Sequence, residues 1–288
     1  MFLQQIFNGL TMGSIYSLLA VGVTMIYKSL GMLNFAHGDM MMVSAFICLS
    51  LIKFGVPLYL AIVLAAITAA CLGFVLERFY YRKLEFSSFV NMLIASVGVS
   101  FVMRNSSIVI WGTSPQLFPQ IFSTTPINIG GFLINPQSIG VISVAAVLAT
   151  LLQLFFYKTK AGKCMRVAAS DAEAASMLGI NVTKCRLLTF VISSALAAIA
   201  GILLAPMSYV RIDMSILVGL KAFAAAILGG IGNVVGALVG GVLLGLIEAL
   251  GANYISTAYK DVIAFLVLFV VLFVKPTGLF AKRVEQKL

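Results

Sequence analysis

Charge is scarce in this 288-residue chain, in which only 10% of the residues are charged and 61% are hydrophobic. Soluble domains carry about a quarter charged residues, so this chain cannot cover a water-facing globule with polar surface. The composition therefore predicts a polytopic membrane protein. The net charge of +10 is explained by short basic loops between spans, as in the positive-inside effect, and we expect no binding of nucleic acid.

The sequence also lacks the residue clusters of an enzyme or a metal site. It has one histidine, and its four cysteines form no CxxC pair, so we predict neither a metal site nor a disulfide framework. HExxH and GxSxG are absent, and Gly162-Lys163 continues into Cys164, which excludes a Walker A motif. We therefore expect no catalytic residue and no cofactor, and any nucleotide hydrolysis must come from another chain.

Long apolar segments follow one another along the chain, each close to the roughly 20 residues that a membrane-crossing helix needs. They predict an all-α polytopic helix bundle with eight or nine membrane segments, in a single transmembrane domain over 1–288. Two segments are short and next to polar breaks, so they either cross fully or enter only part of the way. The expected spans are 6–27, 36–52 (short), 57–77, 90–111, 136–157, 187–208, 215–229 (short), 234–252 and 261–275.

Basic residues orient these spans. They form three groups that fall on one face if every segment crosses, and that face should be cytoplasmic, with the N-terminus outside and the C-terminus inside. The loop at 112–135, on the opposite face, has no charged residue and contains Gly130-Gly131, as expected of an irregular external loop. The groups are Arg78, Arg82 and Lys83; Lys158, Lys160, Lys163, Arg166, Lys184 and Arg186; and Lys275, Lys282, Arg283 and Lys287.

The longest polar interval, 158–186, lies between two spans and would face the cytoplasm. Its stretch AASDAEAASMLG combines good helix formers with early acidic residues and a terminating glycine. It predicts a short amphipathic helix near 170–180 whose apolar residues dock into a groove of a partner; a solvated loop is the alternative. The candidate contact residues are Asp171, Glu173, Ala174, Ala175 and Gly179.

Three ionisable residues fall inside the spans, where a charge needs a partner or water. Arg104, Lys221 and Glu248 would lie about 6–11 Å below the outer surface, at 1.5 Å per helical residue. Lys221 and Glu248 stand on consecutive antiparallel segments and can pair. The three residues are therefore either a satisfied ion pair with a snorkelling arginine, or the lining of an external vestibule.

A polar break, GMLNFAHGD, precedes the second span at its inner end. Asn34, His37 and Asp39 stand beside Gly38, which suggests a tight, hydrogen-bonded helix start with Asn34 as its N-cap. The alternative is a gate on a path through the membrane. A proton relay through His37 is disfavoured, because the sequence offers it no carboxylate partner at depth.

Glycine is concentrated near the end of the chain. Small residues four positions apart form a flat stripe on which another helix can approach closely. Such a stripe serves either packing within the chain or an interface with a second membrane subunit. Its members are Gly232, Gly236, Gly240, Gly241 and Gly245.

Several stretches together resemble a known family. Glu173-Ala174-Ala175 followed by Gly179 resembles the EAA---G coupling motif of ABC importer permeases, although the downstream hydrophobic-then-proline part is absent. The fuller match is to the LivH-type permeases of branched-chain amino acid ABC importers, and it covers nearly the whole chain. It rests on NGLTMGSIYSLLAVGVTMIY, GMLNFAHGD, KAGKCMRVAASDAEAASMLGIN, KAFAAAILGGIGNVVGALVGG and YKDVIAFLVLFVVLFVKPTGLF.

The resemblance implies a non-catalytic, multi-pass permease subunit of the cell (inner) membrane that carries leucine, isoleucine or valine. It implies as partners a LivM-type second permease, two cytoplasmic ABC ATPases and an external substrate-binding protein, in addition to membrane lipid. The helix near 170–180 would couple to the ATPases. Two alternatives stay open: a permease of this family for urea, amides or other amino acids, and a stand-alone channel or ion-coupled carrier for a small solute. The latter needs ionisable coupling residues near the midplane, which the sequence does not clearly offer.

Overall fold

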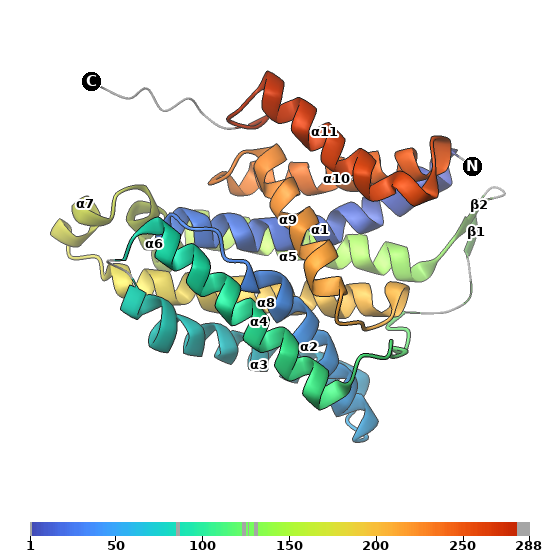
Figure 1. The fold of residues 1–288 in the computed structure, drawn as a ribbon, viewed down its shortest axis with the longest axis horizontal. Helices are drawn as coiled ribbons and strands as arrows, with labels where there is room; N and C mark the ends of the chain where they lie inside the picture. Colours follow the sequence, from blue (N-terminus) through green and yellow to red (C-terminus); the bar gives the residue numbers. More distant parts are fainter. Residues whose placement is uncertain (1, 85–86, 123–124, 126, 130–131, 281–288) are drawn as a thin grey trace.

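The computed structural model describes residues 2–84, 87–122, 125, 127–129 and 132–280. Within them, eight apolar helical segments are long enough to cross a membrane, the last of which, Thr257–Val274, includes a short 3-10 turn at its start. This confirms the predicted all-α polytopic bundle (Figure 1). A further apolar helix at the short segment predicted over 215–229 has only 16 residues. Of the residues used to predict orientation, Lys282, Arg283, Lys287 and the Gly130-Gly131 pair lie outside the described part of the chain.

The helices begin and end within a few residues of the predicted spans. Their bounds are α1 (Phe2–Leu30), α2 (Ala36–Lys53), α3 (Leu58–Val75), α4 (Phe89–Trp111), α5 (Pro136–Lys158), α6 (Lys160–Ser170), α7 (Ala172–Met177), α8 (Val182–Ser208), α9 (Met214–Gly229), α10 (Val234–Tyr254) and α11 (Lys260–Val274). A π-helical turn, η1 (Leu76–Tyr80), and a 3-10 turn, η2 (Tyr81–Leu84), extend α3, and a second 3-10 turn, η3 (Thr257–Tyr259), precedes α11. The expected irregular loop contains one short antiparallel hairpin, β1 (Ile127–Ile129) with β2 (Phe132–Ile134), in which Ile127 pairs with Ile134.

Polar side chains start several helices where the apolar runs begin. Ser88 accepts the backbone N–H of Asn91 at the start of α4, and Asn135 accepts that of Gln137 at the start of α5. Pro136 occupies the first position of α5, where its missing N–H removes no helical hydrogen bond. These caps satisfy backbone donors that would otherwise be left unpaired near the bilayer.

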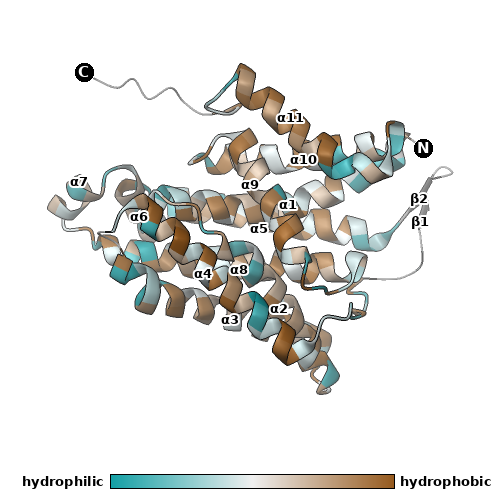
Figure 2. Ribbon diagram, in the orientation of Figure 1, coloured by the Kyte–Doolittle hydropathy of each residue, from teal (hydrophilic) through white to brown (hydrophobic). Residues whose placement is uncertain are grey.

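Helix α1 forms the centre of the bundle and α11 lies at its edge. In the most apolar 18-residue window, 89% of α1 is buried, whereas only 6% of the segment Thr257–Val274, which consists of η3 and α11, is buried. Helix α1 packs against α5, α8, α9 and α10, and α11 packs mainly on α10. Figure 2 shows hydrophobic residues along the length of α11, which presents an apolar outer face. A helix of this kind suits a lipid-facing position.

The two ends of the bundle carry different elements. In Figure 1 the start of α1 and the β1–β2 hairpin lie at one end of the molecule, and α7 lies at the opposite end. This relative arrangement is the one that the basic groups predict.

The glycine stripe packs within the chain, on two faces of α10. Gly236 and Gly240 contact Gly229 and Ala225 of α9, and Gly241 contacts the backbone of Ser17 on α1. Gly245 also lies against α1, at Gly13 and Gly9. The expectation that Gly232 belongs to this stripe is wrong: it lies in the α9–α10 turn with φ of 90°, because α10 begins only at Val234.

Substituting alanine for Gly241 should destabilise the fold. A methyl group there would overlap the main chain of Ser17, and forcing an extra carbon into a packed core costs about 1–3 kcal/mol. Gly98→Ala on α4 is the matched control, since a Cβ atom added at Gly98 would lie 3.9 Å from its nearest neighbour, the Tyr80 hydroxyl. We expect Gly241→Ala to lower the melting temperature measured in detergent, and Gly98→Ala to leave it unchanged or raise it. Equal melting temperatures would contradict the close α1–α10 contact.

Candidate functional site

The structure brings Lys221 and Glu248 together inside the bundle. The Lys221 ammonium lies 2.7 Å from Glu248 Oε1 and 2.6 Å from Asp261 Oδ1. The Tyr16 hydroxyl donates a hydrogen bond of 2.8 Å to the other oxygen of Glu248. Lys221 and Glu248 are only 5% and 6% exposed, so each charge is satisfied by the protein itself. This network joins α1, α9, α10 and α11 at one point.

Two members of this network are absent from the residues singled out in the sequence. Asp261 begins the last predicted span, and an acidic residue at that position is a signal that could have been paired with Lys221. Tyr16 lies in the middle of an apolar run, where a tyrosine is unremarkable in sequence. Its role depends on α1 and α10 lying side by side, which only the fold reveals.

The polar break before α2 is buried inside the bundle. Asn34 Oδ1 accepts the Ala36 N–H at 3.1 Å and the Tyr81 hydroxyl at 2.8 Å. The side chain thus bonds to the helix start, but the expectation that Asn34 is the N-cap is wrong, because α2 begins at Ala36 and Phe35 holds the N-cap position. The Phe35 N–H donates to Ser96 Oγ at 3.5 Å. Ser96 is seven residues into α4, which places the break about 10 Å inside the end of that helix. Irregular backbone at such depth is tolerated where protein surrounds it.

Arg104 is ion-paired and does not snorkel to the outer surface as one of our alternatives had it. Its Nη2 lies 3.3 Å from Asp39 Oδ1, and the Ser100 hydroxyl donates to the same carboxylate. Helices α2 and α4 run parallel, and Trp111 Nε1 donates to Ser50 Oγ at 2.7 Å with the same 61-residue offset as the Asp39–Ser100 bond. Because α2 begins deep in the bundle, the early residue Asp39 reaches the level of the late residue Arg104.

His37 is enclosed between α1 and α8. It is 1% exposed, and its Nδ1 lies 3.4 Å from Ser193 Oγ. A Cβ atom added to Gly22 of α1 would lie 2.5 Å from His37 Nε2, so the ring fills the space that a glycine leaves. His37 is therefore a packed part of the α2 start, next to the Asn34 and Asp39 interactions.

The polar interval forms two helices instead of the single helix expected near 170–180. Helix α6 ends at Ser170, and Asp171 has an extended backbone with φ of −154°. The Asp171 carboxylate accepts the N–H of Ala174 at 2.9 Å, so it caps the short helix α7. Gly179 ends the turn after α7 with φ of 77°, a conformation that glycine adopts without strain. The break follows from this strong N-cap residue.

The tip of α7 divides its apolar residues between two environments. Ala175 is fully buried, whereas Met177 is 87% and Leu178 74% exposed. Glu173 stands in the first turn of α7, where its charge favours the helix dipole. Helix α7 lies at one end of the molecule (Figure 1). The exposed pair Met177 and Leu178 forms the tip of α7, and two large exposed apolar side chains suit a contact with another protein.

The described residues contain no group of three or more His, Cys, Asp or Glu side chains placed to hold a metal ion. Cys48, Cys71, Cys164 and Cys185 are free thiols. The polar clusters instead consist of ion pairs and hydrogen bonds that connect helices. These contacts hold neighbouring helices together, and they can exchange partners if the helices move.

Comparison with known proteins gives a consistent result over the full length. A family model described as the branched-chain amino acid transport system / permease component matches residues 5–272. The high-affinity branched-chain amino acid transport system permease protein LivH of Salmonella typhimurium is 37% identical, over 99% of this chain and 97% of the relative. The corresponding protein BraD of Pseudomonas aeruginosa is 38% identical, over 99% and 98%.

Among solved structures, a chain of PsaBC from Streptococcus pneumoniae in complex with Fab matches with a TM-score of 0.54. The match covers 94% of this chain and 91% of that chain at 15% identity. This similarity concerns the arrangement of the helices alone.

Replacing Lys221 should destabilise the protein more than replacing Glu248. Lys221→Met leaves two carboxylates close together without a cation, and removing one partner of a buried pair costs about 3–5 kcal/mol. Glu248→Gln keeps the Lys221–Asp261 pair and an oxygen that accepts from Tyr16, so its cost should be about 1 kcal/mol. Thermal unfolding in detergent measures both. Equal losses, or a milder effect of Lys221→Met, would contradict the shared role of Lys221.

Proposed function

This chain belongs to the branched-chain amino acid transport permease family, and from that premise we propose that it is the membrane-spanning permease subunit of an ATP-driven importer for leucine, isoleucine or valine. The observation that carries the proposal is the 36–38% identity to LivH and BraD proteins over 99% of the chain. The matches cover 99% of this chain and 97–98% of the relatives, so they include every membrane-spanning segment described above. The eight apolar helices meet the requirement of a multi-pass permease.

Energy comes from separate chains in this proposal. The sequence has no Walker A motif, so two cytoplasmic ABC ATPases bind and hydrolyse ATP. A LivM-type permease completes the translocation path, and an external binding protein delivers the amino acid. The basic loops support an inner-membrane orientation with α6 and α7 in the cytoplasm and the start of α1 outside.

Helix α7 is the proposed contact to an ATPase. Its caps at Asp171 and Gly179 fix a short, rigid projection, and Met177 and Leu178 supply exposed apolar anchors. Helix α6, one residue before it, packs on α1, α5 and α8. Movement of α7 by an ATPase would therefore be passed directly to central helices, as in a rigid-body rocking mechanism.

The break before α2 is the proposed gate. Asn34, His37 and Arg104 hold this irregular segment through hydrogen bonds and one ion pair, and such contacts can exchange when helices shift. Lys221 and Glu248 fit the role of a structural ion pair better than that of a vestibule lining, because the pair joins α9 to α10 with almost no exposure to water. A vestibule lining would need these two charges to face solvent.

Transport measured in liposomes tests the whole assignment. Leucine uptake should require the second permease, the ATPases, the binding protein and ATP, and it should stop when any one is omitted. Uptake by this chain alone would establish a stand-alone channel or carrier and overturn the proposal. Binding of urea or an amide, but not of leucine, isoleucine or valine, to the cognate binding protein would retain the importer and replace its substrate.

The α7 contact makes a separate prediction. Met177→Asp combined with Leu178→Asp should reduce co-purification of the ATPases by roughly tenfold or more, because buried apolar anchors at interfaces are worth about 2 kcal/mol or more each. Leu117→Asp is the matched control, since Leu117 is 76% exposed at the other end of the molecule. Membrane levels of both variants should equal wild type. Unchanged ATPase association in the tip variant would remove α7 from the coupling role.

A further inference from the structure

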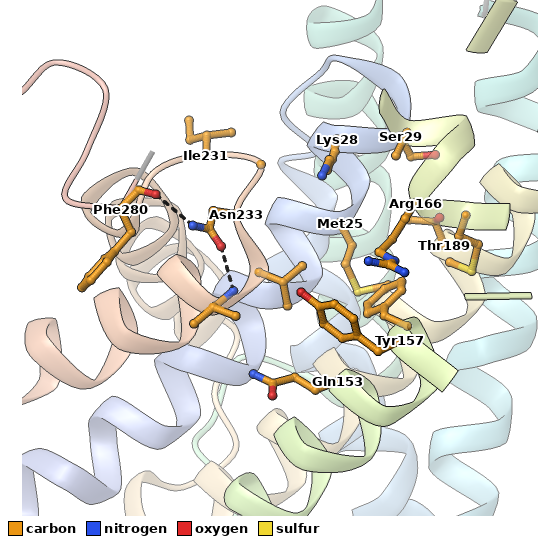
Figure 3. A pocket seen from close by; sticks show the side chains of 16 residues that line it. Met25, Lys28, Ser29, Gln153, Tyr157, Arg166, Thr189, Ile231, Asn233 and Phe280 are labelled. Carbon is orange, nitrogen blue, oxygen red and sulfur yellow. Dashed lines mark hydrogen bonds between the residues drawn. The ribbon is translucent and has the colours of Figure 1, made fainter. Parts of the chain in front are cut away.

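A cavity of about 540 Å³ lies at the end of the bundle that carries α7 (Figure 3). It is open on one side and is bordered by the last turns of α1 and α5, by α6 and α8, by the α9–α10 turn with the start of α10, and by the segment after α11. The side chains around it fall into a cationic and polar group and an apolar group. The lining residues are Met25, Lys28, Ser29, Gln153, Phe156, Tyr157, Met165, Arg166, Ala169, Thr189, Ile231, Gly232, Asn233, Val234, Val235 and Phe280.

The charge of the lining is entirely positive. Lys28 and Arg166 are the charged residues of this lining, which contains no Asp or Glu. In the described part of the chain, neither residue has an acidic partner within salt-bridge distance. Two cations that share a cavity without a carboxylate repel one another, and an anion between them would relieve that repulsion.

Arg166 is held ready for such an anion. Its guanidinium lies 4.4 Å from the centre of the Tyr157 ring, and the two side chains stack in Figure 3. Its Nε is buried and makes no hydrogen bond to any residue that the structure describes. A stacked guanidinium loses little freedom on binding, and its planar fork suits the oxygens of a phosphate.

The apolar part of the lining indicates what kind of anion fits. Met25, Phe156 and Met165 line the interior, whereas Val235 and Phe280 are each 46% exposed. A free, strongly hydrated anion gains nothing from these surfaces. An amphiphile with an anionic head and a hydrocarbon tail satisfies both halves of the lining.

We propose that this cavity binds the phosphate headgroup of an anionic phospholipid from the adjacent leaflet. The basic groups in the sequence place this end at the cytoplasmic side, where basic pockets between membrane helices take anionic lipid headgroups. Lys28 and Arg166 contact the phosphate, and the acyl chains leave over the apolar residues. A zwitterionic amino acid is the poorer occupant, because its ammonium group would meet two cations and no carboxylate.

The site goes beyond the proposed transport function and does not depend on the solute carried. Its consequence is mechanical, because Lys28 belongs to α1 and Arg166 to α6. A phosphate shared by the two residues ties the helix before α7 to the central helix of the bundle. Bound anionic lipid should therefore restrict the movement of α6, and of α7 after it, relative to α1.

The full-length chain, purified in detergent, tests the site with dioleoyl phosphatidylglycerol as the probe and phosphatidylcholine as the neutral lipid. Native mass spectrometry gives lipid occupancy, and thermal unfolding gives the shift caused by lipid. Lys28→Gln with Arg166→Gln removes the cations of the cavity. Lys160→Gln with Lys163→Gln is the matched control, since both residues are exposed on α6 and outside the lining. Ser29→Glu is a second test that keeps both cations and adds a negative charge to the lining.

Phosphatidylglycerol should raise the melting temperature of wild type and of the control more than phosphatidylcholine does. Affinity should fall roughly fivefold for each cation removed, and Ser29→Glu should reduce it as well. If the cavity variants bind phosphatidylglycerol as well as wild type, or if the control loses as much, the site is overturned in favour of general surface attraction. An equal shift with inorganic phosphate would replace the lipid by a free anion. A shift with leucine that the cavity variants lose would make the cavity part of the solute path.

Discussion

One buried lysine that is shared by two carboxylates fixes the relative positions of four helices. A charge inside a membrane protein is costly unless a partner of opposite charge lies beside it, so Lys221 must stay where Glu248 and Asp261 can both reach it. The Tyr16 hydroxyl on the central helix uses the remaining oxygen of Glu248. Small shifts of α9, α10 or α11 would break these contacts, and the glycine-lined surfaces of α10 then set how closely α9 and α1 approach it.

Two of the shorter helices, α2 and α9, pack against each other inside the bundle. Helix α2 begins about 10 Å inside the end of α4, and α9 has only 16 residues. They meet at Gly38 and Gly219, where the absence of side chains brings the two backbones into contact. Backbone N–H groups at the start of α2 bond to Asn34 and Ser96. After the turn that ends α9, Asn233 accepts two N–H groups at the start of α10. Irregular structure is thus confined to places where protein supplies the hydrogen bonds that lipid cannot.

Most of the fold could be predicted from the sequence, because hydropathy and length determine which segments form membrane helices. The pairing of Lys221 with Glu248 also followed from sequence, since the two segments are consecutive and antiparallel. The partnership of Asp39 with Arg104 did not, because it depends on how far α2 is displaced along α4. The sequence pattern predicts Asp171 inside a single helix, whereas Asp171 is the N-cap that separates α6 from α7. Tyr16 and Asp261 complete the buried network through contacts between helices that are distant in sequence, and no local pattern encodes those contacts.

The peripheral position of α11 has a consequence for how the protein is made. Helix α11 follows α10 in the chain, and only Ala264 among its residues is buried, so it can enter the bilayer as an independent apolar segment. Lys221 is not left alone in the meantime, because Glu248 on α10 precedes α11 in synthesis. Asp261 then joins at one end of α11, and at the other the backbone of Leu279 and Phe280 bonds to Leu228 and Gly229. Insertion of α11 and its docking against α9 and α10 can therefore take place as separate events.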